Sequence, residues 1–430
     1  MRKPRLRPPV RRTRRRWRVP PAITHGSEAF EGAGILEEIP GKLGLLLWQS
    51  VRDVTLWAGT PDEAREGLFT PGAEQQRRTA LRAAAADPVL EPALAEMAEI
   101  LSRPRATTGE LMARACRRVA EWADERELTA TAIAFVQAAA LAAPLDADTA
   151  YAVARLARRR AEHARAETWY RRAIALARQS GDWSAYSLAF LGLGNLYMQR
   201  GSFPPARRLY VRALRAARRH SLHAVAGMIF HDLFVLAVAS GRPQEAERAA
   251  REAHGEYGDD HPRLCALAHD VAYFWMDQGY SARALSVFEA LLPHITRPAE
   301  RLAAMANLAR AAAGTGARTR FEEGWRSVWE GAAEADVQEG ASEAFVELAY
   351  GATEIGDWTR ARDAAERAMR LAAEREEPRT LPRAERVLEA VRQRRSAQAP
   401  PAQVEDTAAR EADAFAEALV RSLNAAALAE

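Results

Sequence analysis

Two His-Asp dyads are the residues of this sequence whose types and spacing could support catalysis. His231-Asp232 and His269-Asp270 lie 38 residues apart. In some hydrolases, dyads of this kind hold a metal ion that activates a water molecule. Such a centre also needs a separate upstream histidine and a downstream aspartate around a closed helix bundle. Here the dyads fall at nearly equivalent positions of a repeating unit, so we predict that repeat duplication explains them, with aspartate bonding across a helix pair.

Other catalytic signatures are missing from the sequence. It contains no glycine-rich phosphate loop before a Lys-Ser/Thr pair, no G-x-S-x-G and no zinc-type H-E-x-x-H. We therefore predict a protein that is not an enzyme, with no catalytic residues, no metal and no cofactor.

The dyads belong to a repeat that runs through most of the chain. In each unit a small residue starts a triplet of the form A-x3-Φ-x2-A, where Φ is larger, and Ala206, Tyr210 and Ala213 form the best example. This spacing places three apolar residues on one helical face, where the small residue lets two helices approach closely. The triplets start, at intervals of 34 to 40 residues, at Ala132, Ala166, Ala206, Ala246, Ala284, Phe321 and Ala361. The matches at Ala246 and Ala361 are weaker, because alanine is common in this chain and such spacings also arise by chance.

Turn residues support this register. A glycine stands five residues before five of the triplets and suits the end of a preceding helix, because it takes positive φ without strain. These glycines are Gly201, Gly241, Gly279, Gly316 and Gly356. Two units depart from the pattern, with Ala161 at a turn position and Phe321 at a small position, and we expect distortion there.

The segment Leu193-Gly194-Asn195-Leu196-Tyr197, followed by Ala206, Tyr210 and Ala213, resembles the tetratricopeptide repeat, with L-G-x2-Y in a first helix and A-x3-F/Y-x2-A in a second. The resemblance covers roughly residues 107–395. It implies an all-α fold, a right-handed superhelix of about seven helix pairs with extra N- and C-terminal helices. It also implies an adaptor that binds a protein or peptide in a concave groove.

The same register predicts which side chains of the first helices face the groove. Aromatic anchors, cations and an asparagine that binds backbone amides suit an extended peptide or helix. The alternative is an ordinary solvated face. The candidate groove residues are Tyr151, Arg155, Asn195, His231, His269, Tyr273, Arg310 and Tyr350. Family members with a carboxylate clamp also use a lysine, and since none stands in the expected places we predict no clamp.

Charge is distributed unevenly along the chain. Residues 1–18 hold ten Lys or Arg and no acid, whereas the remainder holds 51 basic and 57 acidic residues. Such an arm can neutralise phosphates of nucleic acid or an anionic surface. The alternative function is therefore a regulator that senses a peptide or ligand with its repeats and contacts nucleic acid with this arm. Two alternatives stay open: the arm is only a solvated tail, or the start codon has been assigned too early.

We divide the chain into four regions: a basic disordered arm (1–40), an N-terminal helical cap or adapter (41–106), the repeats (107–395), and a linker with a C-terminal amphipathic helix (396–430). This last helix caps the far end, folds back into the groove or engages a partner, and capping is the default expectation. The apolar stretch 43–57 is too short to span a bilayer, so we expect no transmembrane segment. No signal peptide is visible, and Cys116 and Cys265 suggest no disulfide framework. We expect a cytoplasmic protein of bacterial type, and its oligomeric state stays open.

Overall fold

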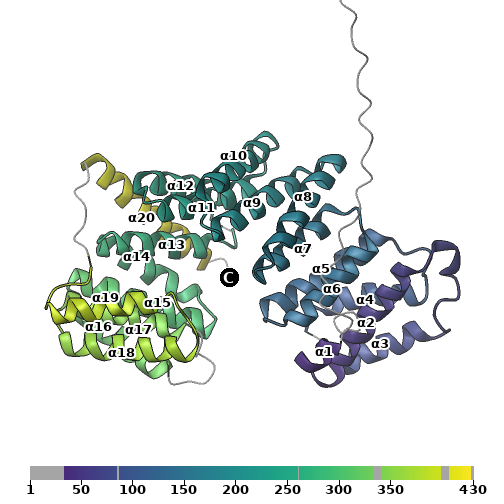
Figure 1. Ribbon diagram of the computed structural model, residues 1–430, viewed down its shortest axis with the longest axis horizontal. Helices are drawn as coiled ribbons and strands as arrows, with labels where there is room; N and C mark the ends of the chain where they lie inside the picture. Colours follow the sequence, from purple (N-terminus) through teal and green to yellow (C-terminus); the bar gives the residue numbers. More distant parts are fainter. Residues whose placement is uncertain (1–32, 85–86, 260, 333–339, 399–405, 428–430) are drawn as a thin grey trace, which may run out of the picture. The chain divides into compact units, whose positions relative to one another are not determined.

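The computed structural model describes residues 33–84, 87–259, 261–332, 340–398 and 406–427. Residues 1–32 of the predicted arm, including the basic residues 1–18, lie outside these residues. The prediction of a disordered arm up to residue 40 was wrong for its last part, because Ala33–Glu38 form a helix in which Ile35 is buried. Those described are all-α and divide into two compact units, Met1–Ala216 and Ala217–Glu430 (Figure 1). The predicted all-α fold of tetratricopeptide-like helix pairs with extra terminal helices is confirmed. No helix in the described ranges combines the length and apolar character needed to cross a membrane.

The first unit begins with four helices that precede the repeats. They are α1 (Ala33–Glu38), α2 (Gly41–Gly59), α3 (Ala73–Ala84) and α4 (Glu91–Ala98), with short 3-10 turns at Asp62–Ala64 and Glu99–Leu101. The helix pairs follow as α5 (Gly109–Glu125), α6 (Thr129–Ala142), α7 (Ala147–Arg159), α8 (His163–Ser180), α9 (Trp183–Gln199) and α10 (Phe203–Arg219).

The N-terminal helices pack against the first helix pair. Helices α1 and α2 contact α6, and α4 contacts α5. Helix α6 has no capping side chain of its own, since Leu128 precedes it. The Glu38 carboxylate replaces that cap by accepting hydrogen bonds from the backbone N–H groups of Ala130 (2.7 Å) and Thr131 (2.9 Å). A distant carboxylate thus satisfies donors that a helix start leaves free.

The second unit continues the helix pairs. Its helices are α11 (His223–Ala239), α12 (Pro243–Tyr257), α13 (Leu264–Asp277), α14 (Ser281–Leu291), α15 (Pro298–Thr315), α16 (Arg318–Gly331), α17 (Ala341–Glu354), α18 (Trp358–Glu374), α19 (Leu381–Arg392) and α20 (Asp406–Ala427), with a 3-10 turn at Leu292–His294.

The predicted triplet register is confirmed in both units. Every residue that starts a triplet is at most 1% exposed, including the weaker sequence matches Ala246 and Ala361. The unit with Phe321 is not disrupted, because glycines make room for the ring. A Cβ on Gly351 would lie 3.1 Å from Phe321 Cε2, and a Cβ on Gly324 would lie 2.7 Å from Ala309 Cβ. In this unit the close approach of two helices lies at Gly324, three residues after the residue that starts the triplet.

The turn at Ala161 also keeps the repeat geometry. Ala161 adopts φ 58°, close to the φ 69° of Gly201 at the equivalent turn. An L-residue in this left-handed region costs about 1–2 kcal/mol. The expectation of distortion was therefore wrong here. The turn is retained, and Ala161 adopts the strained backbone conformation that a glycine would adopt without strain.

This strain gives a prediction. Ala161→Gly should raise the free energy of unfolding by about 1 kcal/mol, because glycine takes positive φ without a Cβ clash. Ala175→Gly, in the middle of α8, should lower it by about 1 kcal/mol, since glycine disfavours helix interiors. Urea denaturation of both variants measures the two changes, and destabilisation by Ala161→Gly would contradict the strained turn.

The sequence predicts that the C-terminal helix caps the end of the repeats, but the structure places this helix elsewhere. Helix α20 packs against α12, α13 and α14 (Figure 1). Arg283 of α14 pairs with Asp413 at 2.5 Å, and His254 Nε2 lies 3.0 Å from Ser422 Oγ. Leu419 and Leu423 are fully buried. The apolar face of α20 therefore packs on helices that come early in the second unit.

Candidate functional site

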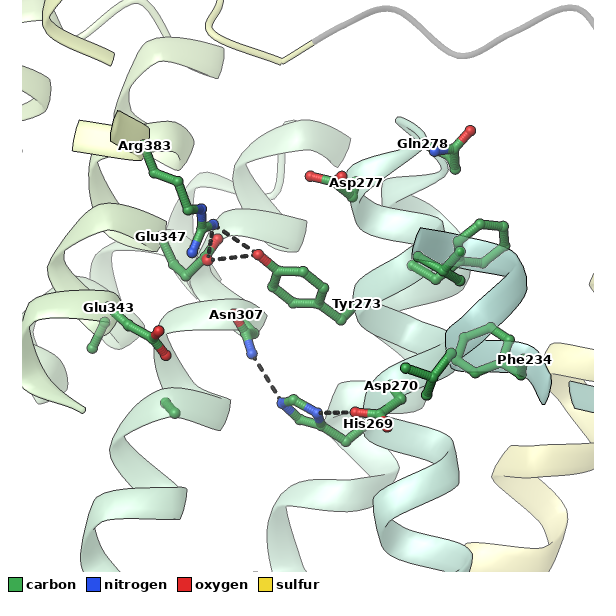
Figure 2. A pocket seen from close by; sticks show the side chains of 15 residues that line it. Phe234, His269, Asp270, Tyr273, Asp277, Gln278, Asn307, Glu343, Glu347 and Arg383 are labelled. Carbon is green, nitrogen blue, oxygen red and sulfur yellow. Dashed lines mark hydrogen bonds and ion pairs between the residues drawn. The ribbon is translucent and has the colours of Figure 1, made fainter. Parts of the chain in front are cut away.

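A cavity of about 450 Å³ opens in the second unit, among the helices that come first in each helix pair. Helices α11, α13, α15 and α17 supply most of its wall, and α19 supplies one side chain (Figure 2). It is lined by Phe234, Val235, Val238, His269, Asp270, Tyr273, Phe274, Asp277, Gln278, Ala303, Asn307, Glu343, Ala344, Glu347 and Arg383. This volume falls within the range of about 300–1,000 Å³ that is typical of ligand sites.

One side of the cavity is apolar. Phe234 and Phe274 pack edge to face with ring centroids 5.7 Å apart, which fixes both rings. Val235 and Val238 stand beside them and remain 37% and 40% exposed. Two adjacent aliphatic side chains of a core-facing helix are thus left open to solvent at the cavity wall.

A polar cluster centred on Asp270 forms a second side. His231 Nε2 and His269 Nδ1 donate to the two carboxylate oxygens of Asp270, at 2.9 and 3.3 Å. The other nitrogen of His269 then accepts from Asn307 Nδ2 at 3.2 Å. Burial favours the protonated carboxyl, but the two histidine hydrogen bonds outweigh it and lower the pKa of Asp270 to about 2.

The hydrogen bond between Asp270 and His231 joins α13 to α11, which are the first helices of two neighbouring pairs, whereas the sequence predicts a bond across one helix pair. The histidines are therefore held by a carboxylate. In the part of the chain that the structure describes, no group of three His, Cys, Asp or Glu side chains is arranged to hold a metal ion.

A second cluster is built around Glu347 of α17, which is 4% exposed. Arg310 Nη1 donates to Glu347 Oε2 at 2.6 Å, and Arg383 pairs with the other oxygen. The Tyr273 hydroxyl donates to Glu347 Oε1 at 3.1 Å and lies 2.7 Å from Arg383 Nη2 (Figure 2). Four helices therefore meet at one buried carboxylate.

The charges of this cluster shift its pKa values. Burial alone would raise the pKa of Glu347, but the two arginines outweigh burial and lower it. The pKa of Tyr273 is raised, first by burial and then by the negative charge of Glu347. Glu347 is thus ionised and Tyr273 neutral at ordinary pH, which is the combination that the hydrogen bonds require.

Two of the predicted groove residues, His269 and Tyr273, line the cavity. The expectation that all eight project into a groove was wrong for three others. His231, Arg310 and Tyr350 are 6%, 3% and 4% exposed. Arg310 Cζ lies 4.4 Å from the centroid of the Tyr350 ring, and Arg310 also pairs with Glu347. Both side chains therefore belong to the buried cluster next to the cavity and are not part of its lining.

The remaining three candidates lie in the first unit and also have partners there. Tyr151 packs near Tyr170 with ring centroids 6.0 Å apart. Arg155 pairs with Asp124 at 3.5 Å, and Asn195 accepts a hydrogen bond from the Tyr210 hydroxyl. These contacts belong to the packing between helices, and a binding role for the three stays a prediction.

The predicted groove residues did not include the polar residues on the acidic side of the cavity. His269, Ala306 and Val346 stand four residues before the predicted groove residues Tyr273, Arg310 and Tyr350, and they are followed directly by Asp270, Asn307 and Glu347. This row of polar residues at one register position was a usable signal. Arg383 belongs to α19 and carried no signal, because its place beside Glu347 depends on the packing of α19 against α17.

Comparison with known proteins gives one family match and several fold relatives. Residues 145–219 match the model of the tetratricopeptide repeat. None of the curated proteins matches the sequence. A Rap protein complexed with competence and sporulation factor is 11% identical, with 82% of this chain and 97% of that chain covered and a TM-score of 0.42. BtubC from P. vanneervenii is 18% identical, with 63% and 93% covered and a TM-score of 0.35. Kinesin light chain repeats of Podosopora anserina are 18% identical, with 44% and 96% covered and a TM-score of 0.37.

Proposed function

We propose that this chain, a tetratricopeptide-like helical repeat protein, binds an extended peptide or protein segment in the cavity of its second unit and works as an adaptor without catalysing a reaction. The observation that carries the proposal is the cavity itself, which joins an exposed aliphatic wall to a fixed polar side. Stacked helix pairs form extended surfaces of this kind for binding.

The cavity is built to bind without rearranging. Tyr273 is held by Glu347 and Arg383, and His269 by Asp270 and Asn307, so the polar side chains are ordered before a partner arrives. Ordering side chains on binding costs about 0.5–1.5 kcal/mol each, and a preorganised site avoids that cost. Val235 and Val238 would be covered by apolar side chains of the partner.

The same hydrogen bonds argue against catalysis. A general base should have a pKa near the working pH. The pKa of Asp270 is lowered to about 2, and that of Glu347 is lowered by its two arginines. Both carboxylates are therefore poor proton acceptors near neutral pH. We propose that they position neighbouring side chains.

Selection of random dodecapeptides displayed on phage against the full chain tests this function. We expect enriched peptides whose affinity falls at least about tenfold in Val238→Trp, because an indole placed on the aliphatic wall fills the cavity; tenfold corresponds to about 1.4 kcal/mol. Fluorescence anisotropy of the labelled peptides gives the dissociation constants.

The matched control is Ala239→Trp. Ala239 is exposed and follows directly after Val238 on α11, but it does not line the cavity. We expect this variant to bind within about twofold of the parent chain, as suits a residue outside the contact. If no peptide is enriched, or if both variants bind every peptide equally, the cavity is not the binding site.

A further inference from the structure

The charges around the cavity specify the kind of peptide that it accepts. We propose that the cavity recognises a basic side chain, arginine or lysine, within the bound segment. This inference rests on the proposed peptide-binding function and adds the chemistry of the ligand.

Negative charge dominates the cavity lining. Four carboxylates line it, those of Asp270, Asp277, Glu343 and Glu347, against one guanidinium, that of Arg383. Asp270 is ionised because its pKa is lowered to about 2. Among the acidic and arginine side chains of the lining, a ligand therefore meets more carboxylates than guanidinium groups.

The carboxylates are also the accessible charges. The side chains of Asp270 and Asp277 are 43% and 60% exposed, and Glu343 is exposed on α17. The cations lie deeper: Arg383 is 26% exposed and Arg310 only 3%, and both pair with Glu347. Arg310 also pairs with Asp277 at 3.3 Å, so the charges of both arginines are compensated within the cluster. A ligand would therefore meet the exposed carboxylates of Asp270 and Glu343 before these arginines.

Asn307 adds an acceptor to the same wall. Its side-chain nitrogen donates to His269, and Oδ1 is buried with no hydrogen-bond partner among the described residues. The whole residue is 4% exposed and lines the cavity. This oxygen therefore adds an unpaired acceptor to the side of the cavity that carries the carboxylates.

The apolar wall fits the stem of a basic side chain. Arginine and lysine bury their methylene groups along apolar surface while the charged end stays in a polar environment. Val235 and Val238 would contact the stem, and Asp277 and Glu343 offer oxygens to the charged end. The cavity thus has the opposite polarity to a clamp for a carboxylate.

The test uses four pools of heptapeptides blocked at both termini. Each pool has one fixed central residue, which is arginine, lysine, norleucine or glutamate, flanked by equimolar leucine, valine, phenylalanine, serine and glycine. Retention on the immobilised full chain is measured in about 50 and about 500 mM NaCl, since salt screens attraction between charges. We expect the arginine and lysine pools to be retained at least about fivefold better than the norleucine and glutamate pools at low salt. High salt should reduce this preference.

Charge reversal locates the contact. Glu343→Lys should remove the preference for the basic pools, whereas Glu366→Lys should keep it. Glu366 is an exposed residue of α18 in the same unit and lies outside the cavity. Both variants change a surface position and should unfold at nearly the same urea concentration as the parent chain.

The outcomes separate this inference from the proposed function. Equal or better retention of the norleucine pool, lost in Val238→Trp, would overturn the basic specificity and leave peptide binding in place. A preference that survives Glu343→Lys would overturn the assignment to this cavity. If no pool is retained by the parent chain, the proposed function falls and the inference falls with it.

Discussion

Replacing Glu347 with alanine should lower the free energy of unfolding by about 3–5 kcal/mol. Glu347 is 4% exposed and pairs with Arg310, which is 3% exposed. Without the carboxylate, the Arg310 guanidinium stays buried without its closest counter-charge, and Arg383 and Tyr273 lose a common partner. Loss of one member of a buried ion pair is far costlier than loss of a surface pair, because the remaining charge cannot reach water.

Glu343→Ala is the matched control for this prediction. Glu343 lies one turn before Glu347 on α17 and also lines the cavity, but it is exposed. Its replacement should change the free energy of unfolding by no more than about 0.5 kcal/mol. Guanidinium denaturation followed by circular dichroism measures both variants. Similar midpoints for the two would show that the Glu347 cluster contributes little to stability.

Gly194→Leu should lower the free energy of unfolding by about 3 kcal/mol through overpacking in the first unit. A Cβ on Gly194 would lie 2.3 Å from Cε1 of Tyr210, which is much closer than any real contact. Tyr210 cannot move aside easily, because its ring is 1% exposed and its hydroxyl donates to Asn195. The leucine therefore has to push α9 and α10 apart.

Gly255→Leu provides the comparison. Gly255 lies within α12, and a Cβ there would meet no atom within 4 Å. Leucine favours helix over glycine by about 0.8 kcal/mol, so this variant should be as stable as the parent chain or slightly more stable. Thermal unfolding followed at 222 nm compares the two. Should Gly194→Leu unfold together with the parent, the helix register assigned from the sequence would be wrong at its best repeat.

The sequence determined the helix pairs and their register. Burial at the triplet positions repeats every three and four residues, and this period is a property of the helix itself. The weak matches Ala246 and Ala361 are therefore as buried as Ala206, at 0% exposed. The turn glycines could also be predicted from the sequence, because the need for a positive φ is a property of the turn itself.

Only the tertiary structure decided which register positions face the cavity. The sequence places Arg310 and Tyr350 on the same face as Tyr273, yet the first two are buried and Tyr273 lines the cavity. Arg310 of α15 pairs with Glu347 of α17, and the Tyr350 ring packs against the guanidinium groups of Arg310 and Arg383, which come from α15 and α19. The position of α20 on α12 and α14 was decided in the same way. A periodic pattern fixes the face of one helix, whereas the neutralisation of a buried charge depends on which helices meet, and those contacts form between residues far apart in the chain.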